Sequence, residues 1–473
     1  MTAPLPLDMQ ALFALQQQAF AAQSFPPEAV RRDRLDRLQR LVAENEHQMA
    51  EAISADFGNR SHHETIIGEV FIVLAAVAHS RRHLRRWMKK RRVRTSFHSL
   101  PGSSSILPQP LGVAGIVSPW NYPLQLALVP AIAALAAGNR VMLKPSELTP
   151  RFSQLLADLV ARHFSVDEFT VVTGDANTGR AFVQLPFNHL FFTGSTAVGR
   201  QVALAAAANL TPVTLELGGK SPAIVDDSAD LLDTARKLAV GKLFNAGQTC
   251  IAPDYALVPA ARVRDFAQAY TRAVEELYPT LEGNADYTSI VNERHFARLQ
   301  ALAQDARSRG AQVQVINPGG APDDPAGRKM RPALLVGVDD SMAVMREEIF
   351  GPLLPVMGYG SLDEAIAFVN ARARPLALYW FGRDRGNQER VLHETVSGGV
   401  TVNDVLLHIA QENLPFGGVG DSGSGAYHGE YGFRIFSKEK PVFEQSRLSG
   451  TWLLRPPYGK LTDWLIRAFK RLL

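Results

Sequence analysis

The sequence predicts an α/β protein that contains a doubly wound parallel sheet and, after it, a second α/β region. Short apolar runs alternate with helical patterns from about residue 112 to residue 208, which is typical of parallel strands joined by crossover helices. The chain has 473 residues, which is too long for one ordinary domain. Its 46% hydrophobic and 20% charged residues are ordinary for a globular protein with a large core.

The region before the alternating stretch predicts mainly helices. An apolar stripe at helical spacing runs from Leu35 to Val42, and a second helix is expected from about Glu64 into a basic block at 81–94. Proline, glycine and serine break the pattern in SFHSLPGSSSILPQPL (96–111), which predicts an extended hairpin or arm.

The alternating stretch supplies the strands and helices of the sheet in order. The predicted strands are GVAGIVSP (112–119), RVMLKP (140–145), EFTVVTG (168–174) and HLFFTG (189–194). The predicted helices are LQLALVPAIAALAA (124–137), TPRFSQLLADLVARHF (149–164), a segment from about Asn177, and STAVGRQVALAAAA (195–208). Gly138 is placed to end the first of these helices. The second α/β region begins at about Gly219.

The composition favours the cytoplasm. Cys250 is the only cysteine, so no internal disulfide can form and nothing points to an oxidising compartment. The N-terminal sequence lacks a basic region followed by an apolar run and a cleavage site, so no signal peptide is expected. No stretch reaches about 18 uninterrupted apolar residues, so no membrane-spanning helix is expected either.

The net charge of +4 conceals one strongly basic block. Residues 81–94 carry nine Lys or Arg and no acid, so the rest of the chain has a charge of about −5 (4 − 9). Such a block can bind nucleic acid or an anionic membrane surface. We favour a solvated helix end, because Leu84, Trp87 and Met88 fall at helical spacing and can anchor the opposite face. We therefore expect no nucleic-acid partner.

A glycine turn after one predicted strand is a candidate phosphate site. Gly194 ends the strand and Gly199 lies near the start of the next helix, where backbone can approach a phosphate. The two glycines are five residues apart, so an ordinary strand-to-helix turn fits as well. Lys144 and Glu147 end another strand, where they can donate to and accept from a ribose. Together these residues predict nucleotide binding, with a capped surface turn as the alternative.

Three residues have the chemistry of nucleophilic catalysis. Asn121 follows the first strand of the sheet, where its amide can donate to an oxyanion or form an Asx turn. A lone cysteine such as Cys250 is more often an inert small hydrophobe, but as a nucleophile it needs a base nearby. Glu216 is the candidate base, although sequence spacing alone does not bring it to Cys250. No metal site is predicted, because the histidines offer no convincing ligand set.

Several motifs resemble the aldehyde dehydrogenase superfamily over roughly residues 30–445. LELGGKSP (215–222) and NAGQTCIAPDY (245–255) are similar to its two active-site signatures. PWNYP (119–123), KPSE (144–147), FTGSTAVG (192–199), EEIFGP (347–352) and LPFGGVGDSGSGAYHG (414–429) occur in that family's order. NDVLLH (403–408) and AYHGEYGFRIFSK (426–438) resemble its class 3 branch. The basic helix and the arm are most similar to bacterial coniferyl aldehyde dehydrogenases.

The resemblance implies a role for each of these residues. Cys250 would be the nucleophile and Glu216 the base, while Asn121 and the backbone N–H of Cys250 would donate to the oxyanion. Lys144 and Glu147 would hold the adenosine ribose. The other cofactor-binding residues that it implies are Trp120, Gly194, Ser195, Gly199, Glu348 and Phe350. The implied reaction is oxidation of an aldehyde, either aromatic, such as coniferyl aldehyde, or long-chain, with NAD as cofactor and NADP as the alternative.

The resemblance also implies a domain layout and a homodimer. The layout is a Rossmann-like cofactor domain at 1–92 and 111–218, a catalytic domain at 219–417, a small β element for bridging or oligomerisation at 93–110 and 418–445, and a C-terminal amphipathic tail at 446–473. Two other functions stay open at this point. One is ester hydrolysis or acyl transfer through Cys250 without redox chemistry, and the other is membrane or nucleic-acid binding through the basic segments.

The tail sequence YGKLTDWLIRAFKRLL (458–473) predicts a basic amphipathic helix. Its apolar stripe consists of Leu461, Trp464, Leu465, Ala468, Phe469 and Leu472. Such a helix can lie in a membrane interface or cover an apolar surface of the protein or its partner subunit. We favour docking on the protein, with weak peripheral membrane contact as the alternative.

Overall fold

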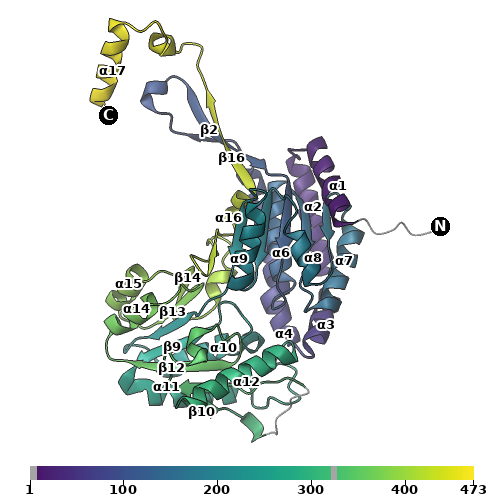
Figure 1. Ribbon diagram of the computed structural model, residues 1–473, viewed down its shortest axis with the longest axis vertical. Helices are drawn as coiled ribbons and strands as arrows, with labels where there is room; N and C mark the ends of the chain where they lie inside the picture. Colours follow the sequence, from purple (N-terminus) through teal and green to yellow (C-terminus); the bar gives the residue numbers. More distant parts are fainter. Residues whose placement is uncertain (1–7, 321–326, 473) are drawn as a thin grey trace, which may run out of the picture.

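Two α/β units and a projecting arm make up the protein (Figure 1). The structure, a computed structural model, describes residues 8–320 and 327–472. Residues 1–7, where the sequence predicts no signal peptide, and the last residue of the predicted tail lie outside these ranges.

The first unit contains a sheet in the order β15-β7-β6-β3-β4-β5. Its parallel strands are β3 (Val113–Val117), β4 (Arg140–Lys144), β5 (Phe169–Val171), β6 (His189–Thr193) and β7 (Val213–Glu216). The short strand β15 (Gly423–Ser424) joins β7 antiparallel at the edge. The chain winds outward from β3 through β4 and β5 and returns to β6 on the other side of β3. Doubly wound sheets bind ligands at such a reversal, here between β3 and β6.

Helices cover both faces of this sheet. One face carries α6 (Gln125–Ala137) and α7 (Pro150–His163), and the other carries α1 (Met9–Ala22), α8 (Ala176–Phe182) and α9 (Thr196–Ala207). Every residue of α6 is buried, because α2 (Glu28–Ala43), α5 (Phe71–Trp87) and α16 (Gly429–Ile435) pack over it. The helix ends at Gly138 with a φ of 96°, as the sequence predicts. α3 (Glu46–Phe57) packs against α7.

One helical run has the length and hydropathy of a membrane span. It covers His62–Trp87 and consists of α4 (His62–Thr65), a π-helical turn η1 (Ile66–Val70) and α5. Its residues Val73, Val77 and Leu84 are fully buried within the protein, where α5 contacts α2 and α6. The run is therefore a core helix of the first unit.

The second unit contains a sheet in the order β10-β11-β12-β9-β8-β13-β14. Its strands are β8 (Pro222–Val225), β9 (Tyr255–Pro259), β10 (Gln312–Val315), β11 (Ala333–Val336), β12 (Leu353–Tyr359), β13 (Ala377–Phe381) and β14 (Gly399–Val402). All neighbours are parallel except β10 and β11. Its helices are α10 (Leu231–Leu243), α11 (Val263–Leu277), α12 (Glu293–Ser308), α13 (Ala343–Arg346), α14 (Leu362–Asn370) and α15 (Arg385–Glu394). The chain passes directly from β7 to β8, so the two sheets meet at residues 217–221.

The arm is an antiparallel sheet that projects from the first unit (Figure 1). It consists of β1 (Arg91–Val93), β2 (Ser103–Pro110) and β16 (Ser437–Glu444), and its far end carries α17 (Lys460–Leu472). The range 418–445 was predicted to belong as a whole to a bridging element, but the structure distributes it between the first unit and the arm. β15 extends the sheet of the first unit and α16 packs on α5 and α6, so only β16 belongs to the arm. β15 lies in the first unit because it forms hydrogen bonds to the free edge of β7.

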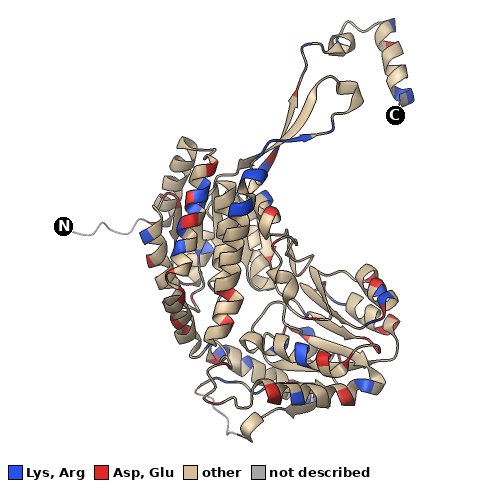
Figure 2. Ribbon diagram, turned by 180° about the vertical axis from the view of Figure 1, so that it is seen from behind, with Lys and Arg blue, Asp and Glu red and all other residues tan. Residues whose placement is uncertain are grey.

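The basic block lies at the root of the arm (Figure 2). Leu84 and Trp87 are buried, as expected for a helix end that anchors its apolar face. Arg86 pairs with Glu430 at 2.9 Å, and Lys90 pairs with Glu444. Acidic residues of the same chain thus compensate part of its charge, which agrees with the solvated-helix interpretation.

Candidate active site

A cavity of about 230 Å³ lies where the two sheets meet, and it gathers most of the predicted site residues. Its lining includes Trp120, Asn121, Gly194, Ser195, Glu216, Cys250, Glu348 and Phe350. These eight residues come from five separate stretches of the chain, between residues 120 and 350. The structure therefore brings together the nucleophile, the base and the oxyanion donor that the sequence predicts.

A tight backbone turn brings Cys250 to this cavity. After α10 the chain passes through Asn245 and Ala246, whose φ angles are 53° and 51°, and then through Gly247 at 74°. Side chains rarely adopt such angles, so surrounding contacts must hold the turn. A Cβ atom at Gly247 would lie 2.4 Å from the carbonyl oxygen of Gly351, which leaves room only for glycine.

The thiol of Cys250 holds its proton tightly. Cys250 keeps some exposed surface, which faces the cavity, but the protein around it is dense. Burial, followed by the charges of Glu348 and Glu216, raises the pKa of the thiol to about 12. The sulfur is therefore protonated at neutral pH and needs a proton acceptor or a nearby positive charge before it can attack a carbonyl carbon.

Glu216 is the last residue of β7, and its carboxylate lies in the cavity wall. It is 3% exposed, and neither carboxylate oxygen has a hydrogen-bond partner within residues 8–320 and 327–472. Burial raises the pKa of this carboxyl well above its usual value. A buried carboxylate without partners accepts a proton more readily than one in water, so the ionised form of Glu216 is suited to take a proton from a water molecule.

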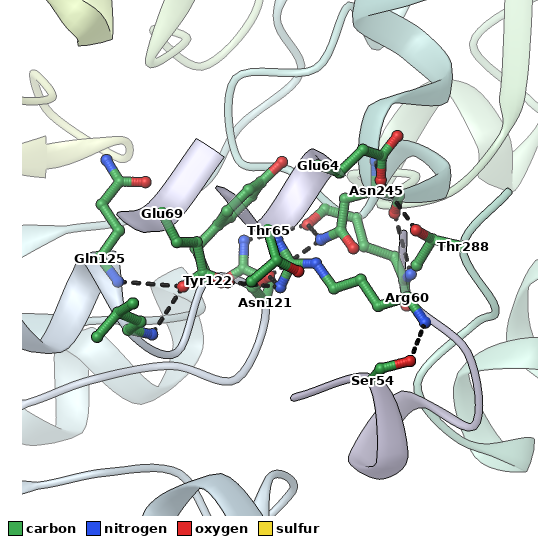
Figure 3. A network of polar contacts seen from close by, with 12 residues as sticks. Ser54, Arg60, Glu64, Thr65, Glu69, Asn121, Tyr122, Gln125, Asn245 and Thr288 are labelled. Carbon is green, nitrogen blue, oxygen red and sulfur yellow. Dashed lines mark hydrogen bonds and ion pairs between the residues drawn. The ribbon is translucent and has the colours of Figure 1, made fainter. Parts of the chain in front are cut away.

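Asn121 lies after β3, and its backbone and side chain are both held (Figure 3). The main-chain oxygen accepts from Nη1 of Arg60 and from Nδ2 of Asn245, each at 3.0 Å. The side-chain Nδ2 donates to the carbonyl oxygen of Gln248 at 3.1 Å. The amide thus lies beside the loop that carries Cys250, where it can turn to a developing oxyanion.

A second cavity, of about 580 Å³, adjoins the first and shares Trp120, Gly194 and Ser195 with it. Lys144 and Glu147 line this cavity, with 3.3 Å between Nζ and Oε2. Lys144 is buried and Glu147 is exposed. Ser195 caps the N-terminus of α9 by accepting from the N–H of Val198 at 3.4 Å, so the helix begins at the cavity. The free N–H groups of a helix N-terminus suit a pyrophosphate.

The two glycines of the predicted phosphate turn have different surroundings. Gly194 lines both cavities, and a Cβ atom there would lie 2.6 Å from the ring of Phe192. Gly199 lies in the first turns of α9 and lines neither cavity. A Cβ atom at Gly199 would lie 2.5 Å from Leu217, so this glycine lets α9 pack closely against the wall of the first cavity. Its place beside a pyrophosphate stays a prediction.

Glu348 and Phe350 face the cavity from the second unit. Burial, then the charge of Asp254, raises the pKa of Glu348 to about 8. A Cβ atom at Gly218 would lie 2.0 Å from Oε2 of Glu348, so a glycine there makes room for the carboxylate. The ring of Phe350 contacts Trp120 edge-on, with 5.5 Å between centroids.

Among the polar residues that line the cavity, sequence reasoning missed Thr193 at the end of β6, and His295 and Arg298 of α12. The ring of His295 lies 5.1 Å from Trp120, and burial, followed by Arg294 and Arg298, lowers the pKa of His295 to about 4. Arg298 donates to the carbonyl oxygen of Glu348 at 3.2 Å. No motif surrounds either residue, because the helix reads as an ordinary amphipathic one. Within the described ranges, no cluster of three or more His, Cys, Asp or Glu residues could hold a metal ion.

Residues 7–442 match the aldehyde dehydrogenase family. The chain belongs to this family. A probable coniferyl aldehyde dehydrogenase of Pseudomonas aeruginosa is 49% identical over 458 residues, which cover 97% of this chain and 95% of that protein. The coniferyl aldehyde dehydrogenase of a Pseudomonas species is 50% identical over 440 residues, 92% of this chain and 91% of the relative.

Solved structures of aldehyde dehydrogenases have the same fold. The substrate-bound state of Staphylococcus aureus AldH has a TM-score of 0.93 at 38% identity and covers 98% of this chain and 100% of its own. Mycobacterium tuberculosis aldehyde dehydrogenase complexed with NAD+ has a TM-score of 0.83 at 27% identity, covering 93% and 90%. The predicted fold class and family are confirmed, and this aldehyde dehydrogenase is an enzyme of aldehyde oxidation.

Proposed function

We propose that the enzyme oxidises an aromatic aldehyde, such as coniferyl aldehyde, to its carboxylate, with NAD as the cofactor. The observation that carries the proposal is the meeting of Cys250, Glu216 and Asn121 in one cavity, which adjoins the cavity of Lys144 and Glu147. The two relatives named for coniferyl aldehyde, at 49% and 50% identity, support the choice of aldehyde over the long-chain alternative.

The first half of the proposed reaction uses Cys250 and Asn121. The thiol of Cys250 first gives its proton to water. The thiolate then forms a bond to the aldehyde carbon, and the carbonyl oxygen becomes the oxyanion of a thiohemiacetal. The Asn121 amide and the backbone N–H of Cys250 donate to this oxyanion. A fixed donor of this kind contributes about 3 kcal/mol to the transition state, so Asn121 is expected to matter strongly for the rate.

The second half uses Glu216. NAD, which Lys144 and Glu147 would hold by its ribose, would supply the acceptor for the hydride that leaves the carbon attached to Cys250. The acyl group then remains as a thioester, whose C–S bond water must break. Glu216 takes a proton from that water as the water oxygen bonds to the acyl carbon and the C–S bond breaks. The acid leaves, and the sulfur takes up a proton to become the thiol again. Burial raises the pKa of Glu216 well above its usual value, so the ionised carboxylate accepts a proton more readily than an exposed one.

The cavities suit a dinucleotide. Thr193 lines both cavities, and Glu348 lines the first. Neither the Thr193 hydroxyl nor the Oε1 atom of Glu348 has a hydrogen-bond partner in the described part of the chain. Buried polar atoms are normally satisfied, so a ligand is the expected partner. Lys144 and Glu147 stand at the end of β4, where a ribose can lie.

Replacing Cys250 tests the mechanism. Cys250→Ala should produce no reduced cofactor from coniferyl aldehyde and NAD, because no thiohemiacetal can form. NAD binding, measured by calorimetry, should stay within about twofold of the wild-type value, since the cofactor cavity is unchanged. Aldehyde oxidation by the variant would overturn the mechanism.

A panel of aldehydes tests the substrate separately. We expect a higher kcat/KM for coniferyl aldehyde than for a simple aromatic or a long-chain saturated aldehyde. A higher kcat/KM for the long-chain aldehyde would overturn the substrate proposal while leaving the mechanism in place.

We also infer that the enzyme is a homodimer joined through the arm. The arm projects from the body, and the outer edge of β16 has no neighbouring strand in the described part of the chain (Figure 1). Phe443 on this strand is 50% exposed. An exposed strand edge with an apolar side chain is a template for pairing with another chain.

For the tail we keep docking as the proposal, now on the partner subunit. α17 lies at the far end of the arm, away from both α/β units (Figure 1). Within the chain it contacts the arm, where the rings of Phe97 and Phe469 lie 5.9 Å apart. Leu461 and Trp464 remain 57% and 60% exposed. The proposed localisation is cytoplasmic, with peripheral membrane contact through α17 as the alternative.

A further inference from the structure

A buried ion pair joins the N-terminal helices to the active site (Figure 3). Nη1 of Arg60 lies 2.8 Å from Oε1 of Glu69, and both side chains are 0% exposed. Neither residue lines the cavities described above. Burying two charges is costly and contributes little to stability on balance, so a pair that is kept in a core calls for another role.

Arg60 holds the segment that carries Asn121. Its Nη1 atom donates to the main-chain oxygen of Asn121 at 3.0 Å. Its guanidinium group also lies over the ring of Tyr122, with 4.8 Å between the carbon and the ring centroid, and over Phe57 at 5.2 Å. A planar guanidinium can make these contacts together, whereas a lysine ammonium cannot.

Glu69 holds the other end of the same segment. Its Oε2 atom accepts from the backbone N–H groups of Leu124 at 2.7 Å and Gln125 at 3.0 Å. These groups begin α6, whose N-terminus has no cap from its own N-cap side chain. The ion pair therefore fixes residues 121–125 at both ends, because the carboxylate caps the helix that follows Asn121.

A second carboxylate from the same run holds the facing loop. Oε2 of Glu64 accepts from the N–H of Asn245 at 3.0 Å and from the Thr288 hydroxyl at 2.9 Å. Asn245 in turn donates to the main-chain oxygen of Asn121. Residues five apart point about 140° away from each other on an α-helix, but the intervening π-helical turn (Ile66–Val70) lets Glu64 and Glu69 both reach the site.

We propose that Arg60 and Glu69 are positioning residues for the oxyanion donor, and that they set the place of the Asn121 amide by holding its backbone and the start of α6. The inference rests on the role proposed for Asn121. Arg60 and Glu69 themselves line neither cavity, so they would act only through Asn121 and its neighbours.

A double-mutant cycle on the full-length enzyme tests the proposal. Asn121→Ala should lower the burst rate of cofactor reduction about a hundredfold. Arg60→Lys should lower it about tenfold, since a small displacement of a catalytic group is costly. In the Asn121→Ala background, Arg60→Lys should change the burst rate less than about twofold, because the donor it positions is already absent.

Other measurements separate positioning from loss of structure. Hydrolysis of p-nitrophenyl acetate without cofactor also forms an oxyanion, so Arg60→Lys should slow it by a similar factor while the Kd for NAD stays unchanged. Glu69→Gln, which keeps the shape of the side chain, is the second variant, with the same expected pattern. Arg34→Lys is the matched control: Arg34 is 1% exposed and pairs with Glu168 at 3.0 Å outside both cavities, so its burst rate should equal that of the wild type.

The outcomes are distinct. The positioning proposal alone would be overturned by either of two results. One is that Arg60→Lys lowers the burst rate by the same factor in the wild-type and the Asn121→Ala backgrounds. The other is that Arg60→Lys and Glu69→Gln both keep the wild-type burst rate. A wild-type burst rate in Asn121→Ala would instead overturn the role of Asn121 itself. If Arg60→Lys does not fold, the cycle with Glu69→Gln decides by the same criteria.

Discussion

Three ionisable side chains around the catalytic cavity, those of Cys250, Glu216 and Glu348, hold their protons more tightly than they would in water. Burial is the largest cause in each case. A positive charge beside the thiol would stabilise its thiolate form, and the nicotinamide ring of NAD carries a positive charge. At the scale of the residue, proton release from Cys250 should therefore be linked to cofactor binding.

The first prediction concerns the thiol without cofactor. Because the pKa of Cys250 is raised to about 12, its thiolate fraction at pH 7–9 lies far below saturation. The rate of alkylation by iodoacetamide should rise about tenfold per pH unit over this range, as the thiolate fraction does. Mass spectrometry of the labelled protein measures the rate. A plateau below pH 9 would contradict the raised pKa.

The second prediction separates the two halves of the reaction. Glu216→Gln should keep a burst of reduced cofactor close to that of the wild type and then turn over slowly, because only the attack of water needs the base. Stopped-flow absorbance measures both phases. Glu412→Gln is the matched control, since Glu412 also has a pKa raised by burial, to about 7, but lines neither cavity. Equal losses of burst and steady rates in Glu216→Gln would count against this division.

The third prediction concerns the choice of cofactor. Glu147 lies at the ribose end of the proposed site, where a carboxylate repels a 2′-phosphate. The wild type should have a higher kcat/KM with NAD than with NADP, and Glu147→Gln should reduce the ratio. A wild-type preference for NADP would refute this role for Glu147.

At the scale of the element, local patterns were sufficient for most of the first unit. The strands β3, β4, β5 and β6 and the helices α6 to α9 lie where apolar periodicity and glycine punctuation predict them. Those signals are local, because each strand is a short buried run and each helix has its own stop.

Other elements depend on contacts that no local pattern reveals. The pairing of Gly423 with Glu216 joins residues about 200 positions apart. Asn245, which has a positive φ angle, is held by a hydrogen bond to Glu64 from another helix. His295 reaches the cavity only because α12 packs there. Glu348 and Phe350 were predicted as site residues only through the resemblance of their motif to a known family. Nothing in the sequence pointed to the Arg60–Glu69 pair.

The fourth prediction concerns α17. If its exposed apolar face docks on the partner subunit, full-length protein should not float with anionic liposomes. A variant that lacks residues 459–473 should behave the same and should lose thermal stability. The membrane alternative would be favoured if the full-length protein floats with the liposomes and the truncated protein does not, while the truncated protein remains an active dimer.

At the scale of the whole molecule, the arm projects from the two α/β units and carries the C-terminal helix at its far end (Figure 1). The fifth prediction is that light scattering at micromolar concentration gives the mass of a dimer. Phe443→Glu, on the exposed side of β16, should shift the enzyme toward monomer, because it places a charge where an apolar contact is expected. Lys438→Glu, near the root of the same strand, is the control for charge. A wild-type monomer would contradict the dimer.

The pairing of β2 with β16 has a consequence for how the chain folds as it is synthesised. Ser103 lies opposite Glu444, so the arm cannot close until nearly the whole chain has left the ribosome. The same holds for β15, which completes the sheet at the strand of the catalytic base. Long-range pairings of this kind form slowly. The nascent enzyme can thus form the parallel strands β3 to β7 before β15 pairs with β7. A protein truncated before residue 423 would lack the strand that borders Glu216.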